Sequence, residues 1–245
     1  EGMKFTNAHT ASAVCTPTRY GLLTGRYPWR TRLKDGVIFP PGKPLIDQDR
    51  ETIGSLLQDK GYYTSVVGKW HLGLEWSMKG EKKINFEAPV KGGPNTLGFD
   101  KSYIIAGSLD MPPYCFIKDG EVETIPGVEV PKEKFGRAGL AVKGLEPEEV
   151  MPRFTEKVVK IIEEHAQQRK DQPLFLYYPL TAPHTPVAPS KQFQGTTTMG
   201  DFGDFVHEVD WTIGRVIKAL KENNMYENTL FVVTADNGTS PNGAG

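Results

Sequence analysis

Five residues able to carry acid–base, anion-binding or metal chemistry follow segments that read as strands. In chain order they are Lys69 and His71 after 63–67, His184 after 174–178, and Asp236 and Asn237 after 230–234. In open α/β sheets, ligands bind beyond the carboxyl ends of the strands. Three separate strand ends delivering such side chains to one edge therefore predict a functional site there.

A fourth element carries a cysteine at the predicted start of a helix. Pro17 fits the first helical position, and Leu22 and Leu23 continue on one side. Cys15 then lies at a helix N-terminus, where backbone N–H groups and the helix dipole favour an anion. Arg19 follows one turn later on the same face. The pattern predicts an activated thiol or an anion pocket, with a buried structural cysteine as the alternative.

The elements that must position these residues alternate between helix and strand. Apolar residues recur at helical spacing over 53–57, 154–165 and 205–220, and strand-like runs follow each of these segments. Helix and strand alternate in this way from 52 to 67 and from 147 to 235. This order predicts an α/β fold with a mostly parallel central sheet flanked by helices.

Composition narrows the class of protein. The 245 residues carry 29 Lys and Arg against 30 Asp and Glu, and the net charge of −1 argues against a nucleic-acid binder. No stretch approaches the roughly 18 apolar residues of a membrane span, so no membrane insertion is expected. Two cysteines are too few for a disulfide scaffold or a four-thiolate zinc site.

Residues 75–145 differ from the rest because they are rich in Gly, Pro and Lys and show little periodicity. We expect an irregular insertion there, functional or mobile rather than part of the core. Cys115 reads as an incidental thiol, with a Cys15–Cys115 disulfide as the alternative. Four aromatic residues around 70–115 either line a sugar or aryl subsite or pack in the core; they are Trp70, Trp76, Tyr103 and Tyr114.

The three other histidines are weaker candidates for functional residues. His165 shares an apolar helical face and is interpreted as structural. His207-Glu208 begins a zinc-protease pattern, but Trp211 stands where the second histidine is required, so that site is rejected. His9 either lines the pocket of Cys15 or is buried against the same helix.

Four ordered motifs resemble the type I sulfatases, which are formylglycine-dependent, arylsulfatase-like members of the alkaline phosphatase superfamily. Cys15-x-Pro17-x-Arg19 with the following 22–26 resembles the first signature of the family, and 68–73 resembles the second. Residues 182–184 and 236–238 are similar to two further blocks. The match runs from Phe5 to Gly238 and so covers nearly the whole chain.

The resemblance implies a role for each site residue. Cys15 would be converted by a maturation enzyme to Cα-formylglycine, whose hydrate attacks sulfur and later expels sulfate as the aldehyde re-forms. A calcium ion would be bound by oxygen ligands, which that hard cation prefers. The remaining roles are hydrate stabilisation by Arg19 and His71, sulfate binding and leaving-group assistance by Lys69 and His184, and calcium ligation by Asp236, Asn237 and the converted Cys15.

The same resemblance sets the expected extent and activity. Residues 1–245 would be a sulfatase catalytic domain truncated at both ends, without the family's N-terminal strand ending in two aspartates and without its C-terminal part. The expected activity is hydrolysis of a sulfate ester, of a sulfated carbohydrate in preference to another small molecule, in a periplasmic, secreted or lysosomal setting. The alternatives are a phosphatase or phosphodiesterase of the same superfamily, and an inactive fragment that binds anions.

Overall fold

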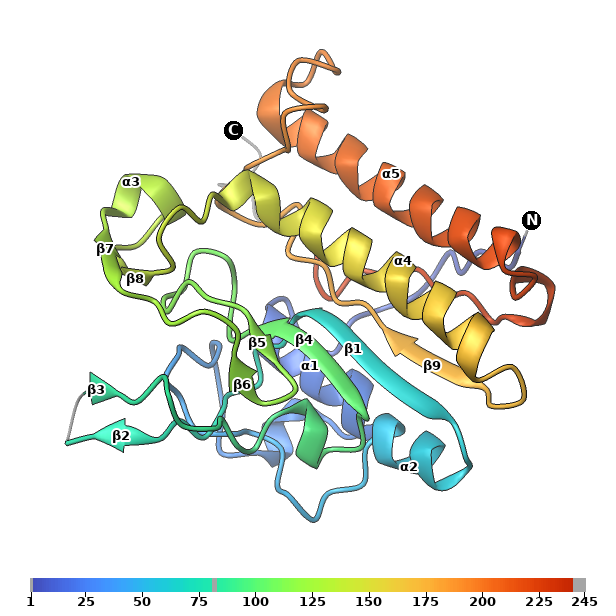
Figure 1. The fold of residues 1–245 in the computed structure, drawn as a ribbon, viewed down its shortest axis with the longest axis horizontal. Helices are drawn as coiled ribbons and strands as arrows, with labels where there is room; N and C mark the ends of the chain where they lie inside the picture. The colour runs from blue at the N-terminus through green and yellow to red at the C-terminus, as the bar shows by residue number, and fades with distance from the viewer. Residues whose placement is uncertain (1, 81–82, 240–245) are drawn as a thin grey trace.

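A five-stranded sheet forms the centre of the computed structural model, which describes residues 2–80 and 83–239 (Figure 1). The strand order is β6-β5-β4-β1-β9. β1 pairs in parallel with both β4 and β9, whereas β5 and β6 continue the sheet antiparallel. The prediction of a mostly parallel central sheet flanked by helices is confirmed. The bounds of the strands are β1 Tyr63–Lys69, β4 Lys101–Ile105, β5 Ile117–Lys118, β6 Glu121–Val122 and β9 Leu174–Tyr177.

Side chains of β1 and β4 alternate between two hydrophobic clusters, because successive residues of a strand point to opposite faces. Val67 and Tyr103 belong to one cluster, and Val66 and Ile104 belong to the other. Both faces of these strands are therefore covered. This explains why the buried run at 63–67 reads as continuously apolar or small rather than alternating.

Long helices cover one face of the sheet and short helices cover the other (Figure 1). α4 (Val150–Gln168) and α5 (Gly200–Glu222) pack together and contribute to the cluster that contains Val67. α1 (Cys15–Thr24) contributes Tyr20 and Leu23 to the opposite cluster. α2 (Ile53–Asp59) is capped at its N-terminus by Thr52, whose side chain accepts from the Ser55 N–H in a capping box.

The remaining elements are short and peripheral. They are strands β2 Met78–Lys79, β3 Lys83–Ile84, β7 Val128–Val130 and β8 Gly139–Ala141, helix α3 Lys132–Phe135, and 3₁₀ turns η1 Pro28–Arg30, η2 Pro94–Thr96, η3 Pro147–Glu149 and η4 Tyr226–Asn228.

Two expectations about the elements are wrong. Residues 75–145 are not simply an irregular insertion, because β4 adjoins β1 in the central sheet and Tyr103 and Ile104 are core residues. Strands of two to five residues are too short to produce a period that can be recognised in the sequence. Residues 230–234 form no strand: no described strand pairs with them, and Leu230 and Val232 are largely exposed. An extended apolar run needs a pairing partner to become a strand.

The start of α1 also differs from the prediction. The helix begins at Cys15, so Pro17 occupies its third position instead of its first. Proline is tolerated there because the first-turn N–H groups have no partner within the helix. The expected place of Cys15, at the helix N-terminus, is confirmed.

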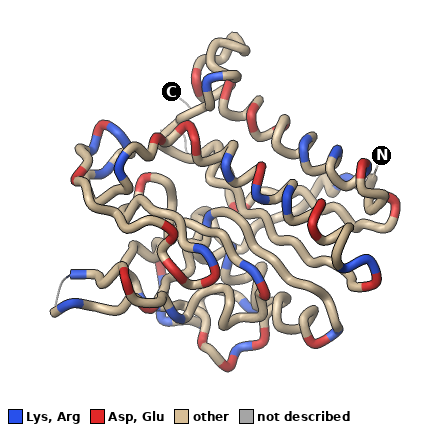
Figure 2. The backbone as a smooth tube through the Cα atoms, in the orientation of Figure 1, with Lys and Arg blue, Asp and Glu red and all other residues tan. Residues whose placement is uncertain are grey.

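Charged residues of both signs are interspersed along α4 and α5 (Figure 2), as expected for helix faces in contact with water. Among the described residues, no helix is long and apolar enough to cross a membrane.

Candidate active site

The candidate site lies where the N-terminus of α1 meets the carboxyl end of β1. The Thr16 hydroxyl donates to the His71 carbonyl at 2.8 Å, and Arg19 Nη1 donates to the Lys69 carbonyl at 2.8 Å. These buried hydrogen bonds join two segments that are at least 50 residues apart in sequence. They bring the cysteine helix and the Lys69–His71 segment together.

Cys15 and Lys69 are in direct contact. Lys69 Nζ donates to Cys15 Sγ at 3.2 Å, and both residues are buried. Burial lowers the pKa of Lys69, and the nearby Arg19 cation lowers it further, while Cys15 acts in the opposite direction. No side chain caps the N-terminus of α1, because Val14 stands at the capping position. The first-turn N–H groups and the Lys69 ammonium therefore make a site for an anion.

Arg19 pairs with Asp236 across this site. Arg19 Nη2 lies 2.7 Å from Asp236 Oδ2, although the angles fall outside those of a hydrogen bond. Asp236 follows α5 in the chain and is half-buried. Two buried cations, Arg19 and Lys69, thus meet one carboxylate, which leaves the site with an excess of positive charge.

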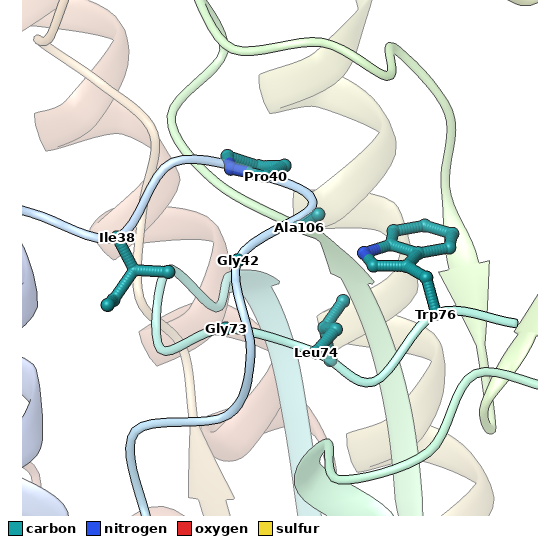
Figure 3. A pocket seen from close by; sticks show the side chains of 7 residues that line it. All are labelled: Ile38, Pro40, Gly42, Gly73, Leu74, Trp76 and Ala106. Atoms are coloured by element: carbon teal, nitrogen blue, oxygen red, sulfur yellow. The ribbon is translucent and has the colours of Figure 1, made fainter. Parts of the chain in front are cut away.

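Two glycines allow backbones to approach closely beside the site. Gly68 has φ 131°, and a Cβ there would lie 2.0 Å from the Pro179 carbonyl. Gly73 has φ 78°, and a Cβ there would lie 2.1 Å from the Lys43 carbonyl. Figure 3 shows the loop around Pro40 folded against the segment that contains Gly73. The small hollow between them is lined by uncharged residues, so it is packing space beside the site.

His71 is held in a strained conformation. Its φ of 60° is left-handed, a region that costs a non-glycine residue about 1–3 kcal/mol. Its N–H donates to the Ala106 carbonyl at 3.1 Å, which helps to fix it. Burial, followed by the nearby Lys69 cation, lowers the pKa of His71 to about 2, so the ring is neutral. Neither ring nitrogen hydrogen-bonds a described residue.

His184 lies at the more open side of the site. Its side chain is 37% exposed, and Nδ1 lies 2.7 Å from the Thr185 carbonyl. Burial and then the Lys69 cation lower the pKa of His184, whereas Asp110 and Asp236 act in the opposite direction. The imidazole therefore shares one electrostatic environment with Lys69 and Asp236.

The expected calcium ligands fit a cation in part. Asn237 Oδ1 is buried and accepts no hydrogen bond from a described residue, whereas the buried Asp236 Oδ2 lies against the Arg19 guanidinium. An unsatisfied buried oxygen is costly, and a hard cation would satisfy it. The oxygens of these two residues fall short of the 6–8 that calcium takes. No cluster of three His, Cys, Asp or Glu residues suited to a metal occurs within 2–80 and 83–239.

Sequence reasoning missed two residues. Thr16 accepts from the Ile38 N–H at 3.2 Å while it donates to His71, so it joins three segments. Asp110 lies 4.0 Å from His184. It follows β4, and inspection of strand ends would have found it had β4 been recognised.

The other candidates lie outside the site or carry no role in it. His165 is buried with Nε2 2.7 Å from the Gln172 carbonyl, in keeping with the structural interpretation. His9 is exposed and bonded to Asn7, so neither expectation for it holds. Cys15 and Cys115 are both free and form no disulfide. The four aromatic residues considered for a subsite are all buried in the core: Trp70, Trp76, Tyr103 and Tyr114.

Comparison with known proteins agrees with this geometry. The family described as Sulfatase matches residues 1–245. The chain belongs to the sulfatase family. A solved structure from work on glycosaminoglycan metabolism by Bacteroides thetaiotaomicron superposes with a TM-score of 0.80 at 29% identity, over 93% of this chain and 53% of that one.

Named sulfatases are similar over most of this chain. An N-acetylgalactosamine-6-O-sulfatase from Bacteroides thetaiotaomicron is 30% identical over 97% of this chain and 52% of its own length. Human arylsulfatase A is 30% identical over 97% of this chain and 45% of its own length. This sulfatase-family chain therefore spans about half the length of these relatives.

Proposed function

We propose that this chain forms part of the catalytic domain of a sulfuric ester hydrolase whose substrate is a sulfated carbohydrate. The observation that carries the proposal is the contact between Lys69 Nζ and Cys15 Sγ, 3.2 Å apart at an uncapped helix N-terminus. Membership of the sulfatase family supports the reaction class. A relative named for N-acetylgalactosamine 6-O-sulfate supports the substrate class.

Cys15 is the residue that a maturation enzyme would oxidise to formylglycine. Once formed, the aldehyde hydrate would supply an oxygen nucleophile for sulfur, and re-formation of the aldehyde would allow release of sulfate. Lys69 and Arg19 lie where they can stabilise the anionic sulfuryl group. The ring of the buried His71 is neutral, and neither of its nitrogens hydrogen-bonds a described residue, so His71 is suited to hydrogen-bond a hydroxyl of the hydrate.

His184 is the proposed general acid for the leaving alcohol. Its partly exposed ring lies at the open side of the site, where a departing sugar would leave. Its Nδ1 is bonded to the Thr185 carbonyl, so Nε2 is the nitrogen that remains to exchange a proton with substrate. Lys69 is the second candidate for this role.

Calcium is the proposed metal, and Asp236 and Asn237 would supply part of its ligand set. When bound, the cation would stabilise negative charge on the sulfuryl oxygens. Asp236 also pairs with Arg19, so it links the proposed metal to the sulfate-binding cations. By family resemblance the protein would act in a periplasmic, secreted or lysosomal setting.

A hydrolysis screen on the full-length protein tests the proposal. The substrates are sulfated monosaccharides, nitrophenyl sulfate and nitrophenyl phosphate, with protein co-produced with a formylglycine-generating enzyme. We expect turnover of sulfates well above that of the phosphate, and mass spectrometry should find the peptide containing Cys15 converted. Phosphate turnover that exceeds sulfate turnover would favour the phosphatase alternative. Converted protein with no turnover of any ester would favour the inactive alternative.

A further inference from the structure

We propose that Asp110 is a positioning residue that enables the His184 imidazole, oriented by the Thr185 carbonyl, to carry a positive charge. The inference rests on the proposed function, since it assigns Asp110 a task through the proposed general acid. Asp110 lies beyond β4 and His184 beyond β9, so two different strand ends bring them together.

The orientation of His184 follows from its hydrogen bonds. A carbonyl oxygen only accepts, so the 2.7 Å contact with the Thr185 carbonyl places a proton on Nδ1. That same nitrogen is the one 4.0 Å from Asp110 Oδ1. The carboxylate therefore faces the side of the ring that already carries a proton, and Nε2 is left for the substrate.

The Asp110 carboxylate is fixed and only partly satisfied. Its side chain is 12% exposed, and Oδ1 is buried without a hydrogen-bond partner in the described part of the chain. Oδ2 is paired with Arg137, whose guanidinium also donates to the Asp110 carbonyl at 3.2 Å. The Tyr114 hydroxyl donates to the Arg137 carbonyl at 2.7 Å. A buried oxygen without a partner that lies toward an imidazole is suited to stabilise its cationic form.

The charges around His184 explain why the Asp110 carboxylate matters for protonation of the imidazole. Lys69 at the end of β1 opposes protonation of His184, and burial opposes it more strongly. Asp110 after β4 and Asp236 after α5 act against both effects. Asp236 is already paired with Arg19, whereas Asp110 Oδ1 has no competing hydrogen bond. Asp110 thus preserves the proton that a general acid must donate.

Asp110→Asn is the primary variant because it keeps the shape and removes the charge. We expect kcat for a sugar sulfate to fall about 10- to 100-fold, by analogy with the loss of a carboxylate partner of a metal-bound histidine. Nitrophenyl sulfate, whose leaving group needs no acid, should lose little, and KM should stay near wild type. The basic limb of the pH–rate profile should move to lower pH, since a neutral amide no longer favours the imidazolium.

Arg137→Gln provides the opposite test and Tyr114→Phe the matched control. Removal of the cation leaves the Asp110 charge uncompensated, so the basic limb should move to higher pH. Tyr114→Phe loses two hydrogen bonds to the same loop without changing its charge, and it should leave the limb in place. Equal losses on both esters in Asp110→Asn, or an unmoved limb in both charge variants, would overturn the proposal.

Imidazole NMR separates this inference from the proposed function. The chain has five histidines, so the His184 signal can be assigned by its loss in His184→Gln. We expect this signal to titrate at lower pH in Asp110→Asn than in wild type, and at higher pH in Arg137→Gln. These shifts are measurable even if no ester is hydrolysed. An unchanged His184 titration in both variants would show that Asp110 does not act on the ring.

Discussion

The two halves of the candidate site are built differently. The buried half, which we define as Cys15, Thr16, Arg19, Lys69 and His71, is at most 7% exposed at any residue. It stands on a helix N-terminus and a strand end, joined by hydrogen bonds between 16 and 71 and between 19 and 69. The open half, which we define as His184, Asp236 and Asn237, lies on segments without regular structure and is partly exposed.

This difference matches what each half has to do under the proposed function. Charge on a sulfuryl group is the same in every substrate, so its partners benefit from rigid placement on regular elements. Leaving alcohols differ in size, so His184, the member of the open half that would meet them, can lie on a loop at the surface. Asp236 and Asn237 serve the proposed calcium site instead. Substitutions in the two halves should therefore impair activity in different ways.

The largest effect is expected in the buried half. Cys15→Ala should reduce turnover of every sulfate ester by at least about 10⁴-fold, because loss of a nucleophile leaves no substitute for the covalent step. Steady-state kinetics on full-length protein measures it, and Cys115→Ala, also a buried cysteine, is the matched control with activity retained. Turnover by Cys15→Ala at the wild-type rate would show that the nucleophile lies elsewhere.

A selective loss is expected in the open half. His184→Ala should slow a sugar or alkyl sulfate by roughly 10²–10⁴-fold, the usual contribution of general acid catalysis. It should slow nitrophenyl sulfate much less, because that leaving group departs without a proton. Comparison of kcat for the two esters measures the selectivity. If both esters lose equally, His184 binds sulfate and protonates nothing.

Calcium binding should depend on the other residues of the open half. Asp236→Asn should weaken calcium by at least roughly 10-fold, since even residues that only support ligands cost 10–100-fold. Asn237→Asp should strengthen it, because a second carboxylate adds charge to the cation site. Calorimetric titration of full-length variants gives both affinities. Weaker calcium binding by Asn237→Asp would contradict the ligand assignment.

The smallest effect concerns stability. Thr16→Val should lower the free energy of unfolding by about 1–3 kcal/mol, because it leaves the buried His71 carbonyl and the Ile38 N–H unsatisfied. Thr18→Val, which loses one half-buried hydrogen bond to the Ser12 carbonyl, is the control and should cost less. Denaturant titration measures both. If Thr18→Val lowers the free energy of unfolding more than Thr16→Val does, the Thr16 hydrogen bonds do not hold the buried half together.

Much of the fold was predictable because the pattern of β1, α4 and α5 is local. Runs of apolar residues at period 3.6, or continuously over five residues, arise from burial of one helix face or both strand faces. Such patterns need no knowledge of distant residues. β4 escaped notice because it has only five residues, and β5 and β6, which continue the sheet beyond it, have two residues each. Residues 230–234 were mistaken for a strand because hydrophobicity alone cannot show whether a partner is present.

By itself, the sequence determined which residue types follow β1 and β9 and that Cys15 lies at the N-terminus of a helix. Tertiary structure alone decided their partners. The contact of Lys69 with Cys15, the pairing of Arg19 with Asp236 and the approach of Asp110 to His184 each join segments at least 54 residues apart. Their pKa values, unsatisfied oxygens and strain follow from burial and from neighbours across the chain. Those properties depend on which residues are close in three dimensions. The spacing of residues along one strand or helix does not specify this.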